Sequence, residues 1–230
     1  MNHQVYVISA GRYEKLTMSD IQKKEYIFCV PVGQGDLYQK HGCKNVIETG
    51  SLIDSRNFAL DNAFEKNLIC VQLSDDLKKI HVNKNFGEKK ELDHFETIKK
   101  MADLFDKTSG IYLMGIPPTS NDFFAKNLIQ ENAFCIGDML FVKPSKPRFD
   151  KNLTLKEDYD FTLQHIELYK KVIRYQKYIF EFQHYSNDGG AVAYRTDEKE
   201  QTNINYLLKK WPQFISLNKK RKNEILMRVK

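Results

Sequence analysis

Short apolar runs alternate with segments of helical periodicity in the first half of the chain. Strand-like runs are expected at residues 5–9, 25–31, 46–47 and 68–73. Before the last of these runs, the residues from Asp54 to Lys66 carry an apolar stripe at helical spacing, with Asp54 as the expected N-cap. Strands separated by helical crossovers predict an α/β fold with a mostly parallel central sheet flanked by helices.

The second half of the chain predicts further elements of both kinds. Helices are expected at residues 94–106, 154–173 and 198–211, and strands at 111–116, 133–142 and 179–182. Thr154 and Glu157 have the spacing of a capping box at the start of the second of these helices. Gly137 and Asp138 interrupt the strand at 133–142, and a loop is expected over 143–151.

The composition is that of a folded domain without a membrane span. The length of 230 residues allows one compact unit, and 15 Phe and 12 Tyr supply apolar area for a core. No run of about 18 apolar residues is present. The four cysteines form no CxxC pair, and three of them lie in apolar runs typical of buried thiols. Residues 1–4 lack the pattern of a secretory signal, so a cytoplasmic location is expected, in the host if the protein is viral.

The excess positive charge is concentrated near the C-terminal end. The net charge is +6, whereas residues 209–230 alone contain eight Lys or Arg side chains against the single acid Glu224. A concentrated basic segment favours a polyanionic partner such as nucleic acid, and the alternative is a solvated terminal helix that aids solubility. The residues expected to contact DNA are Lys219, Lys220, Arg221 and Lys222.

One apolar strand ends directly in two adjacent acids, Asp75 and Asp76. In a parallel sheet, ligands bind beyond the carboxyl ends of the strands. Two carboxylates at such a place can hold Mg²⁺ or Mn²⁺ together with a substrate phosphate, and the alternative is a polar turn or a helix N-cap. The chain contains no P-loop, no H-E-x-x-H and no G-x-S-x-G motif.

The order of short motifs along the chain resembles that of nucleotide-sugar glycosyltransferases of the GT-A fold. The motifs are Ser9-Ala10-Gly11-Arg12, Ser55-Arg56-Asn57, Asp75-Asp76, Glu157-Asp158, Phe182-Gln183-His184 and Gly189-Gly190. This order is most similar to the TET-associated glycosyltransferase-like group, known from phages and eukaryotic DNA-modification loci. The resemblance covers residues 5–211 and is weakest across 78–143, and Ser74 stands where the metal motif of the fold usually begins with an acid.

The resemblance implies a single GT-A-like domain over residues 1–211, with a basic tail at 212–230 packed on it or extending from it. It implies a nucleotide-sugar donor, expected to be UDP-linked, and Mn²⁺ or Mg²⁺ held by Asp76 and His184. Asp158 is implied as the general base of an inverting transfer, and Glu157 beside it as an acid that stabilises the helix start. Donor contacts are implied for Ser9, Gly11, Arg12, Arg56, Asn57, Asp75 and Arg195.

Members of this group are thought to glycosylate hydroxymethylated pyrimidines in DNA, and a basic tail agrees with that acceptor. Three alternatives stay open. The same chemistry could use a glycan or protein acceptor, the enzyme could be a nucleotidyltransferase that releases pyrophosphate, or the chain could bind nucleic acid without catalysis. The sugar, the modified base, the stereochemistry and the oligomeric state are not specified by the sequence.

Overall fold

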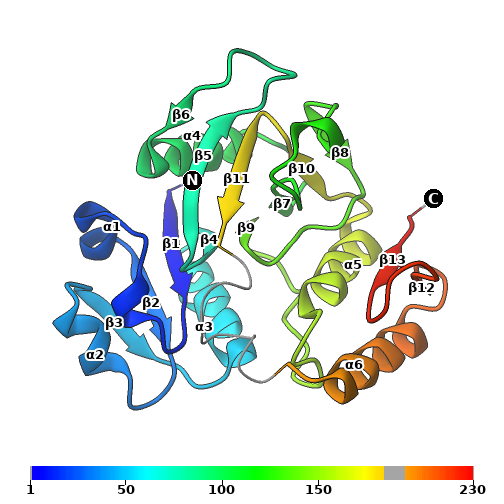
Figure 1. Ribbon diagram of the computed structural model, residues 1–230, viewed down its shortest axis with the longest axis horizontal. Helices are drawn as coiled ribbons and strands as arrows, with labels where there is room; N and C mark the ends of the chain where they lie inside the picture. Colours follow the sequence, from blue (N-terminus) through cyan, green and yellow to red (C-terminus); the bar gives the residue numbers. More distant parts are fainter. Residues whose placement is uncertain (1, 184–194, 230) are drawn as a thin grey trace.

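A large mixed sheet forms the centre of the structure, a computed structural model that describes residues 2–183 and 195–229. Its strand order is β3-β2-β1-β4-β9-β7-β10-β8 (Figure 1). The strands are β1 (His3–Ile8), β2 (Ile27–Val30), β3 (Asn45–Glu48), β4 (Ile69–Ser74), β7 (Leu113–Gly115), β8 (Ile129–Glu131), β9 (Met139–Val142) and β10 (Ile173–Tyr175). All of them run in one direction except β8 and β9, so the expected mostly parallel central sheet is confirmed.

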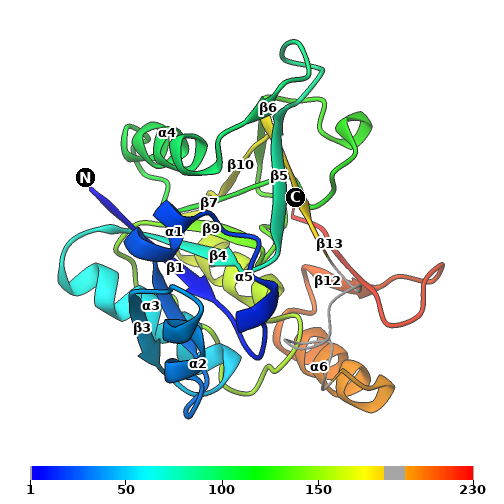
Figure 2. The ribbon, with the colours of Figure 1, turned by 60° about the vertical axis from the view of Figure 1, so that its left-hand side comes forward.

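Helices flank both faces of this sheet, and two smaller sheets lie beside it (Figure 2). The helices are α1 (Asp20–Glu25), α2 (Gly35–Lys40), α3 (Leu52–Glu65), α4 (His94–Asp106), α5 (Glu157–Tyr169) and α6 (Asp197–Lys210), with 3-10 turns η1 (Tyr13–Lys15) and η2 (Asp122–Phe124). One small sheet has the order β11-β5-β6, formed by β11 (Tyr178–Phe182), β5 (Leu77–Val82) and β6 (Glu91–Leu92). The other is the hairpin of β12 (Ile215–Leu217) and β13 (Ile225–Met227).

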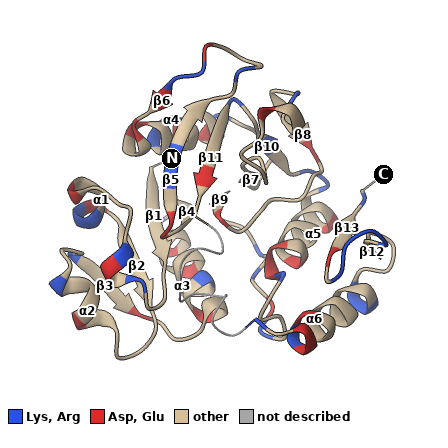
Figure 3. Cartoon of the chain, viewed as in Figure 1, with Lys and Arg blue, Asp and Glu red and all other residues tan. Residues whose placement is uncertain are grey.

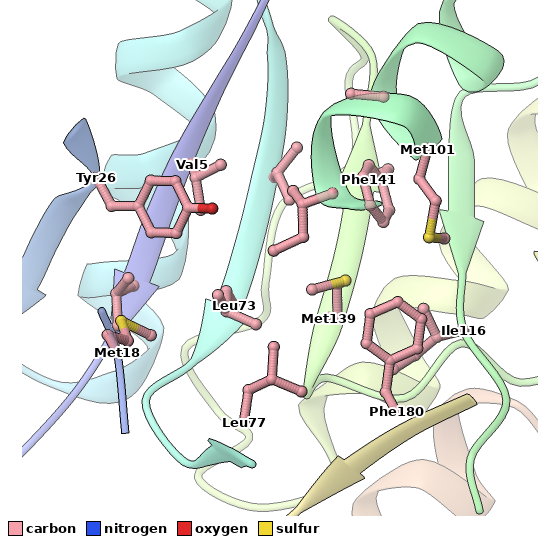
Figure 4. Packing of buried hydrophobic residues seen from close by; sticks show 14 of the residues in the cluster. Val5, Met18, Tyr26, Leu73, Leu77, Met101, Ile116, Met139, Phe141 and Phe180 are labelled. Carbon is pink, nitrogen blue, oxygen red and sulfur yellow. The ribbon is translucent and has the colours of Figure 1, made fainter. Parts of the chain in front are cut away.

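Alternating side chains of the central strands fill two apolar clusters, one on each face of the sheet. Successive side chains of a strand point to opposite faces, so Leu140 and Phe141 belong to different clusters. In the cluster that contains Phe141, Leu73 and Met139 from neighbouring strands meet Phe180 from β11 (Figure 4). Helix α4 covers this cluster, whereas α3, α5 and α6 cover the other. The chain is therefore a single mixed α/β domain with a helix-flanked central sheet.

The start of α3 differs from the expectation. The N-cap is Ser51 and not Asp54. The Ser51 hydroxyl accepts a hydrogen bond from the Asp54 backbone N–H at 3.2 Å, and the Asp54 carboxylate accepts one from the Ser51 N–H at 3.2 Å. Asp54 thus serves the same helix end as the third residue of a capping box, because an acid can satisfy the terminal N–H groups from that position as well.

The expected capping box at Thr154 and Glu157 is wrong. Helix α5 begins at Glu157 after Lys156, which has a left-handed backbone with φ of 58° and makes no side-chain cap. The Thr154 N–H bonds instead to Asn203 Oδ1 of α6 at 2.9 Å. A contact with a distant helix therefore satisfies the Thr154 N–H, in the segment where the sequence pattern predicted a local helix cap. The helix also ends at Tyr169, before the expected limit, because the chain continues into β10.

The C-terminal basic segment folds as the hairpin β12–β13, so the reading of this segment as a terminal helix is wrong. Ile215 and Ile225, one from each strand, are buried in an apolar cluster together with Trp211 at the end of α6. The hairpin is thereby packed on the domain, and its turn carries the basic residues.

The cysteines are buried and unpaired, as expected for structural thiols. No helix within residues 2–183 and 195–229 combines the length and the apolar character that crossing a membrane requires.

Candidate functional site

Two polar loops meet where the strand order of the central sheet reverses. From β1 the chain passes to β2 and β3 on one side, whereas β4 lies on the other side of β1 (Figure 1). The carboxyl ends of β1 and β4 lie side by side at this point, and open α/β sheets bind ligands in the crevice where the strand order reverses. Residues 9–12 follow β1, and Asp75 and Asp76 follow β4.

Arg12 joins these two loops by ion pairs. Its Nη1 atom lies 2.7 Å from Asp75 Oδ1 and 3.4 Å from Asp76 Oδ2. The two aspartates are only 2% and 3% exposed. Because buried carboxylates are costly unless they are paired, Arg12 is the group that compensates the acids of the expected metal motif.

Hydroxyl groups bind the other oxygen of each carboxylate. Ser9 Oγ donates to Asp75 Oδ2, and Ser74 Oγ donates to Asp76 Oδ1 at 2.8 Å. The serine that replaces the first acid of the motif therefore orients the acid two residues later. Burial raises the pKa of the Asp75 carboxyl, while Arg12 and Ser9 oppose this shift.

The loop after β1 is held in place from the α2 side. Gly11 has a φ of +68°, a conformation that favours glycine, and its N–H donates to Gln34 Oε1 at 2.8 Å. The Tyr38 hydroxyl accepts from the Arg12 N–H at 3.2 Å and lies 2.5 Å from Ser9 Oγ. Tyr38 thus holds two of the expected donor-binding residues, Ser9 and Arg12.

Arg56 binds protein groups on three sides at a second cluster. Its Nε lies 3.1 Å from Glu157 Oε1 of α5, its Nη1 donates to Gln72 Oε1 of β4 at 3.0 Å, and its Nη2 donates to the Gly137 carbonyl at 3.1 Å. The guanidinium also lies 5.1 Å from the centre of the Phe149 ring. Helix α3 therefore directs Arg56 inward, between β4 and α5.

Asp158 lies beside Arg56 in the same cluster. Its Oδ2 accepts a hydrogen bond from the Gly137 N–H at 2.9 Å. Burial, and after it the charge of the adjacent Glu157, raises the pKa of Asp158 to about 7. A carboxyl group with a pKa near the working pH can both take up and release a proton, which is the requirement for a general base.

The segment of Gly137 and Asp138 connects the two clusters. Strand β9 runs antiparallel to β4, so the residues before β9 lie at the carboxyl end of β4. The Asp138 carbonyl accepts from the Ser74 N–H at 2.8 Å, while Gly137 contacts both Arg56 and Asp158. The expected strand-end acids and the expected base therefore belong to one edge of the sheet.

Two other expected site residues, Asn57 and Arg195, do not take part in the contacts of these clusters given above. The Asn57 side chain bonds to both backbone groups of Phe149, at 2.9 and 2.8 Å, which fixes the loop before α5. Arg195 lies 3.1 Å from Glu200 of α6. The expected metal ligand His184 lies outside the described residues. Gln183, immediately before it, donates its N–H to the Asp76 carbonyl at 3.0 Å.

Sequence reasoning missed Tyr38 and Gly137. Gly137 was visible as an interruption of a strand-like run, which is a signal for close backbone contact. A Cβ atom at this position would lie 2.5 Å from Arg56 Nη2 and 3.4 Å from Asp158 Oδ2. Tyr38 gave no comparable signal, since its role depends on contacts of α2 with the loop after β1, which is distant in the sequence.

The donor chemistry of the edge fits a hard divalent cation. Carboxylate and hydroxyl oxygens are the ligands that Mg²⁺ and Mn²⁺ prefer. The acids also outnumber Arg12 and Arg56, which leaves a negative excess that a cation would offset. These acids are Asp75, Asp76, Asp138, Glu157 and Asp158. Among the described residues no three His, Cys, Asp or Glu side chains are arranged to hold a metal, and His184, the ligand expected beside Asp76, is not among them.

The expected DNA-binding residues form the turn of the β12–β13 hairpin (Figure 3). Lys222 lies 2.5 Å from Asp197, and Arg221 lies 3.3 Å from Glu224. These partners are exposed carboxylates, so the pairs are weak and can be exchanged for phosphate contacts. Lys219 and Lys220 are exposed as well.

No protein-family model matches the chain, and no curated protein matches it. The functional proposal therefore rests on the sequence motifs, the fold and the geometry of the site.

Proposed function

We propose that this protein is a glycosyltransferase that moves a sugar from a nucleotide-sugar, expected to be a UDP-sugar, to a hydroxyl acceptor. The observation that carries the proposal is that the strand-end acids and the expected base lie near each other, at the carboxyl end of the central strand β4. There the N–H of Ser74, next to the pair Asp75–Asp76, donates to the Asp138 carbonyl, and the half-buried Asp158 carboxylate accepts from the N–H of Gly137. A mostly parallel sheet with this edge agrees with the GT-A fold and with the TET-associated glycosyltransferase-like group that the motif order resembles.

The donor diphosphate is proposed to lie between the loops that follow β1 and β4. Ser9, Gly11 and Arg12 would contact the nucleotide, as the motif resemblance implies. Mn²⁺ or Mg²⁺ bound by Asp76 and His184 would neutralise the charge of the leaving diphosphate.

Asp158 is proposed as the general base. Its carboxylate would take the proton of the acceptor hydroxyl while that oxygen forms a bond to the anomeric carbon and the bond from this carbon to the diphosphate breaks. The Gly137 N–H would orient the carboxylate for this step, and Arg56, which donates to the Gly137 carbonyl, would hold Gly137 in place. Attack from the face opposite the leaving group would invert the anomeric centre.

The proposed acceptor is a hydroxymethylated pyrimidine in DNA. The exposed basic turn of residues 219–222 supports this choice, because Lys and Arg side chains bind phosphates without regard to sequence. A base within a duplex would have to be extruded to reach the half-buried carboxylate of Asp158.

The test is a transfer assay with UDP-sugars and Mn²⁺ on matched DNA duplexes with and without hydroxymethylpyrimidine. Release of UDP with a mass increase of one sugar on the modified strand alone is expected. Release of pyrophosphate would indicate a nucleotidyltransferase, and transfer to glycans or proteins would replace the DNA acceptor. No transfer to any acceptor, together with no nucleotide-sugar binding in calorimetry, would contradict the proposal.

A further inference from the structure

We infer that the Arg12 guanidinium and a divalent metal ion are alternative occupants of the Asp75–Asp76 pair, so that metal binding releases Arg12 toward the donor. The inference rests on the metal site of the proposed function, in which Asp76 is a ligand. It extends that site to Asp75 and adds Arg12 as a residue that controls metal binding.

Each carboxylate of the pair has one oxygen bound by a serine hydroxyl. Asp75 Oδ2 and Asp76 Oδ1 accept hydrogen bonds from the hydroxyls of Ser9 and Ser74. The other oxygen of each carboxylate is Asp75 Oδ1 or Asp76 Oδ2. Both of them are contacted by the same atom, Arg12 Nη1, at 2.7 and 3.4 Å. A metal that bridges the two aspartates would need the oxygens that Arg12 holds.

The net charge of Asp75, Asp76 and Arg12 also favours exchange. Two carboxylates oppose one guanidinium, so the cluster retains a net negative charge that favours a cation. A divalent ion at the pair would lie next to the Arg12 charge in a buried place, where repulsion between like charges is poorly screened. Metal and guanidinium should therefore exclude each other.

The Arg12 side chain can move away from the acids without a change in the backbone of its loop. Hydrogen bonds from the Gly11 and Arg12 N–H groups to Gln34 and Tyr38 anchor the loop independently of the guanidinium. Once released, a guanidinium at the end of β1 is suited to bind phosphate oxygens in a bidentate manner. The same ion that occupies the acids would thus free an anion-binding group for the diphosphate.

The first experiment compares Mn²⁺ affinity of the wild type and Arg12→Gln, measured without nucleotide by the electron paramagnetic resonance signal of free Mn²⁺. Loss of a charge-assisted contact should tighten Mn²⁺ binding by about tenfold or more. Arg148→Gln is the matched control, because Arg148 pairs with the exposed Asp61 at 2.8 Å, away from these loops. Its Mn²⁺ affinity should equal that of the wild type.

The second experiment uses the wild-type protein, so it does not depend on the folding of a variant. Phenylglyoxal modifies accessible arginines, and peptide mapping measures the rate at each site. Mn²⁺ should accelerate modification of Arg12, which is 9% exposed when it is paired with the acids. Arg56, held by Glu157, Gln72 and Gly137, should keep its slow rate and serves as internal control.

Each outcome decides the inference. Tighter Mn²⁺ binding by Arg12→Gln, or faster labelling of Arg12 with Mn²⁺, supports exchange. Unchanged or weaker binding with unchanged labelling overturns exchange but leaves the metal site intact. Absence of Mn²⁺ binding to both proteins overturns exchange and the metal site together. Calorimetry of UDP-sugar binding in a chelator then shows whether the donor site of the proposed function survives.

Discussion

At the scale of single residues, the site depends on how two carboxylates are partnered. Arg56 pairs with Glu157, whereas the neighbouring Asp158 accepts a hydrogen bond from the backbone N–H of Gly137. Burial and the Glu157 charge then raise the pKa of Asp158. The adjacent acids of one sequence motif thus acquire different tasks from their surroundings, one structural and the other suited to proton transfer.

Asp158→Asn should reduce turnover by about 10²–10⁴-fold, because an amide cannot accept the proton. Donor affinity should hardly change. Steady-state kinetics combined with calorimetry of UDP-sugar binding separates the two effects, and near-normal turnover would remove Asp158 from the mechanism.

The same substitution should change how stability depends on pH. A carboxyl whose pKa rises on folding binds more protons in the native state than in the unfolded state, so its contribution to stability is lost as pH rises from about 4 to about 7. Urea unfolding across this range should show a flatter pH dependence for Asp158→Asn than for the wild type. Parallel curves for both proteins would mean that Asp158 titrates normally.

Gly137→Ala tests the close packing of Gly137 against Asp158 and Arg56. The added methyl group would lie 2.5 Å from Arg56 Nη2, so the guanidinium must move. We expect a loss of about 1–3 kcal/mol in the free energy of unfolding, typical of overpacking, and a decrease of turnover. In an Asp158→Asn background the effect on turnover should largely disappear, since the oriented carboxylate is already gone. Additive losses would show that Gly137 acts elsewhere.

At the scale of elements, local patterns located helices and strands better than their ends. Helix α4 spans His94–Asp106, as its apolar periodicity predicts. Helix α5 begins without a side-chain cap because Asn203 of α6 binds the preceding backbone. Strands β5, β8 and β10 and the β12–β13 hairpin escaped sequence reasoning, since short strands obtain their hydrogen bonds from partners distant in the chain.

The hairpin turn gives a prediction at this scale. Replacing Lys219, Lys220, Arg221 and Lys222 by Gln should weaken duplex DNA binding, and the slope of log affinity against log salt should decrease by about 0.9 for each lost phosphate contact. UDP-sugar binding should stay unchanged. The matched control replaces four lysines near α1 and α2, namely Lys23, Lys24, Lys40 and Lys44. Equal salt slopes for all three proteins would show that the turn is only a solvated surface.

At the scale of the whole molecule, both faces of one sheet carry apolar clusters that share the same strands. The C-terminal part joins this core through Trp211, whose Nε1 donates to the buried Asp160 Oδ1 at 2.7 Å. Ile215 and Ile225 of the hairpin pack in the same cluster. The candidate site and the basic turn of residues 219–222 therefore belong to one folded domain.

One cooperative unfolding transition is expected from this arrangement. The chain has a single Trp, so its fluorescence reports the packing of α6 and the hairpin, whereas far-UV circular dichroism reports all elements. The two urea transitions should coincide. A fluorescence change at lower urea than the loss of dichroism would show that the C-terminal part unfolds separately.

The sequence by itself determined the α/β class, the helix of 94–106 and the position of Asp75 and Asp76 directly after a buried strand. These follow from local periodicity and from turn residues, which neighbours in the chain specify. Only the tertiary structure decided that β4 lies beside β1, that Arg12 pairs with both acids, and that Gly137 lies between Arg56 and Asp158. Strand order and ion-pair choice depend on which distant surfaces bury each other, and no local pattern encodes that choice.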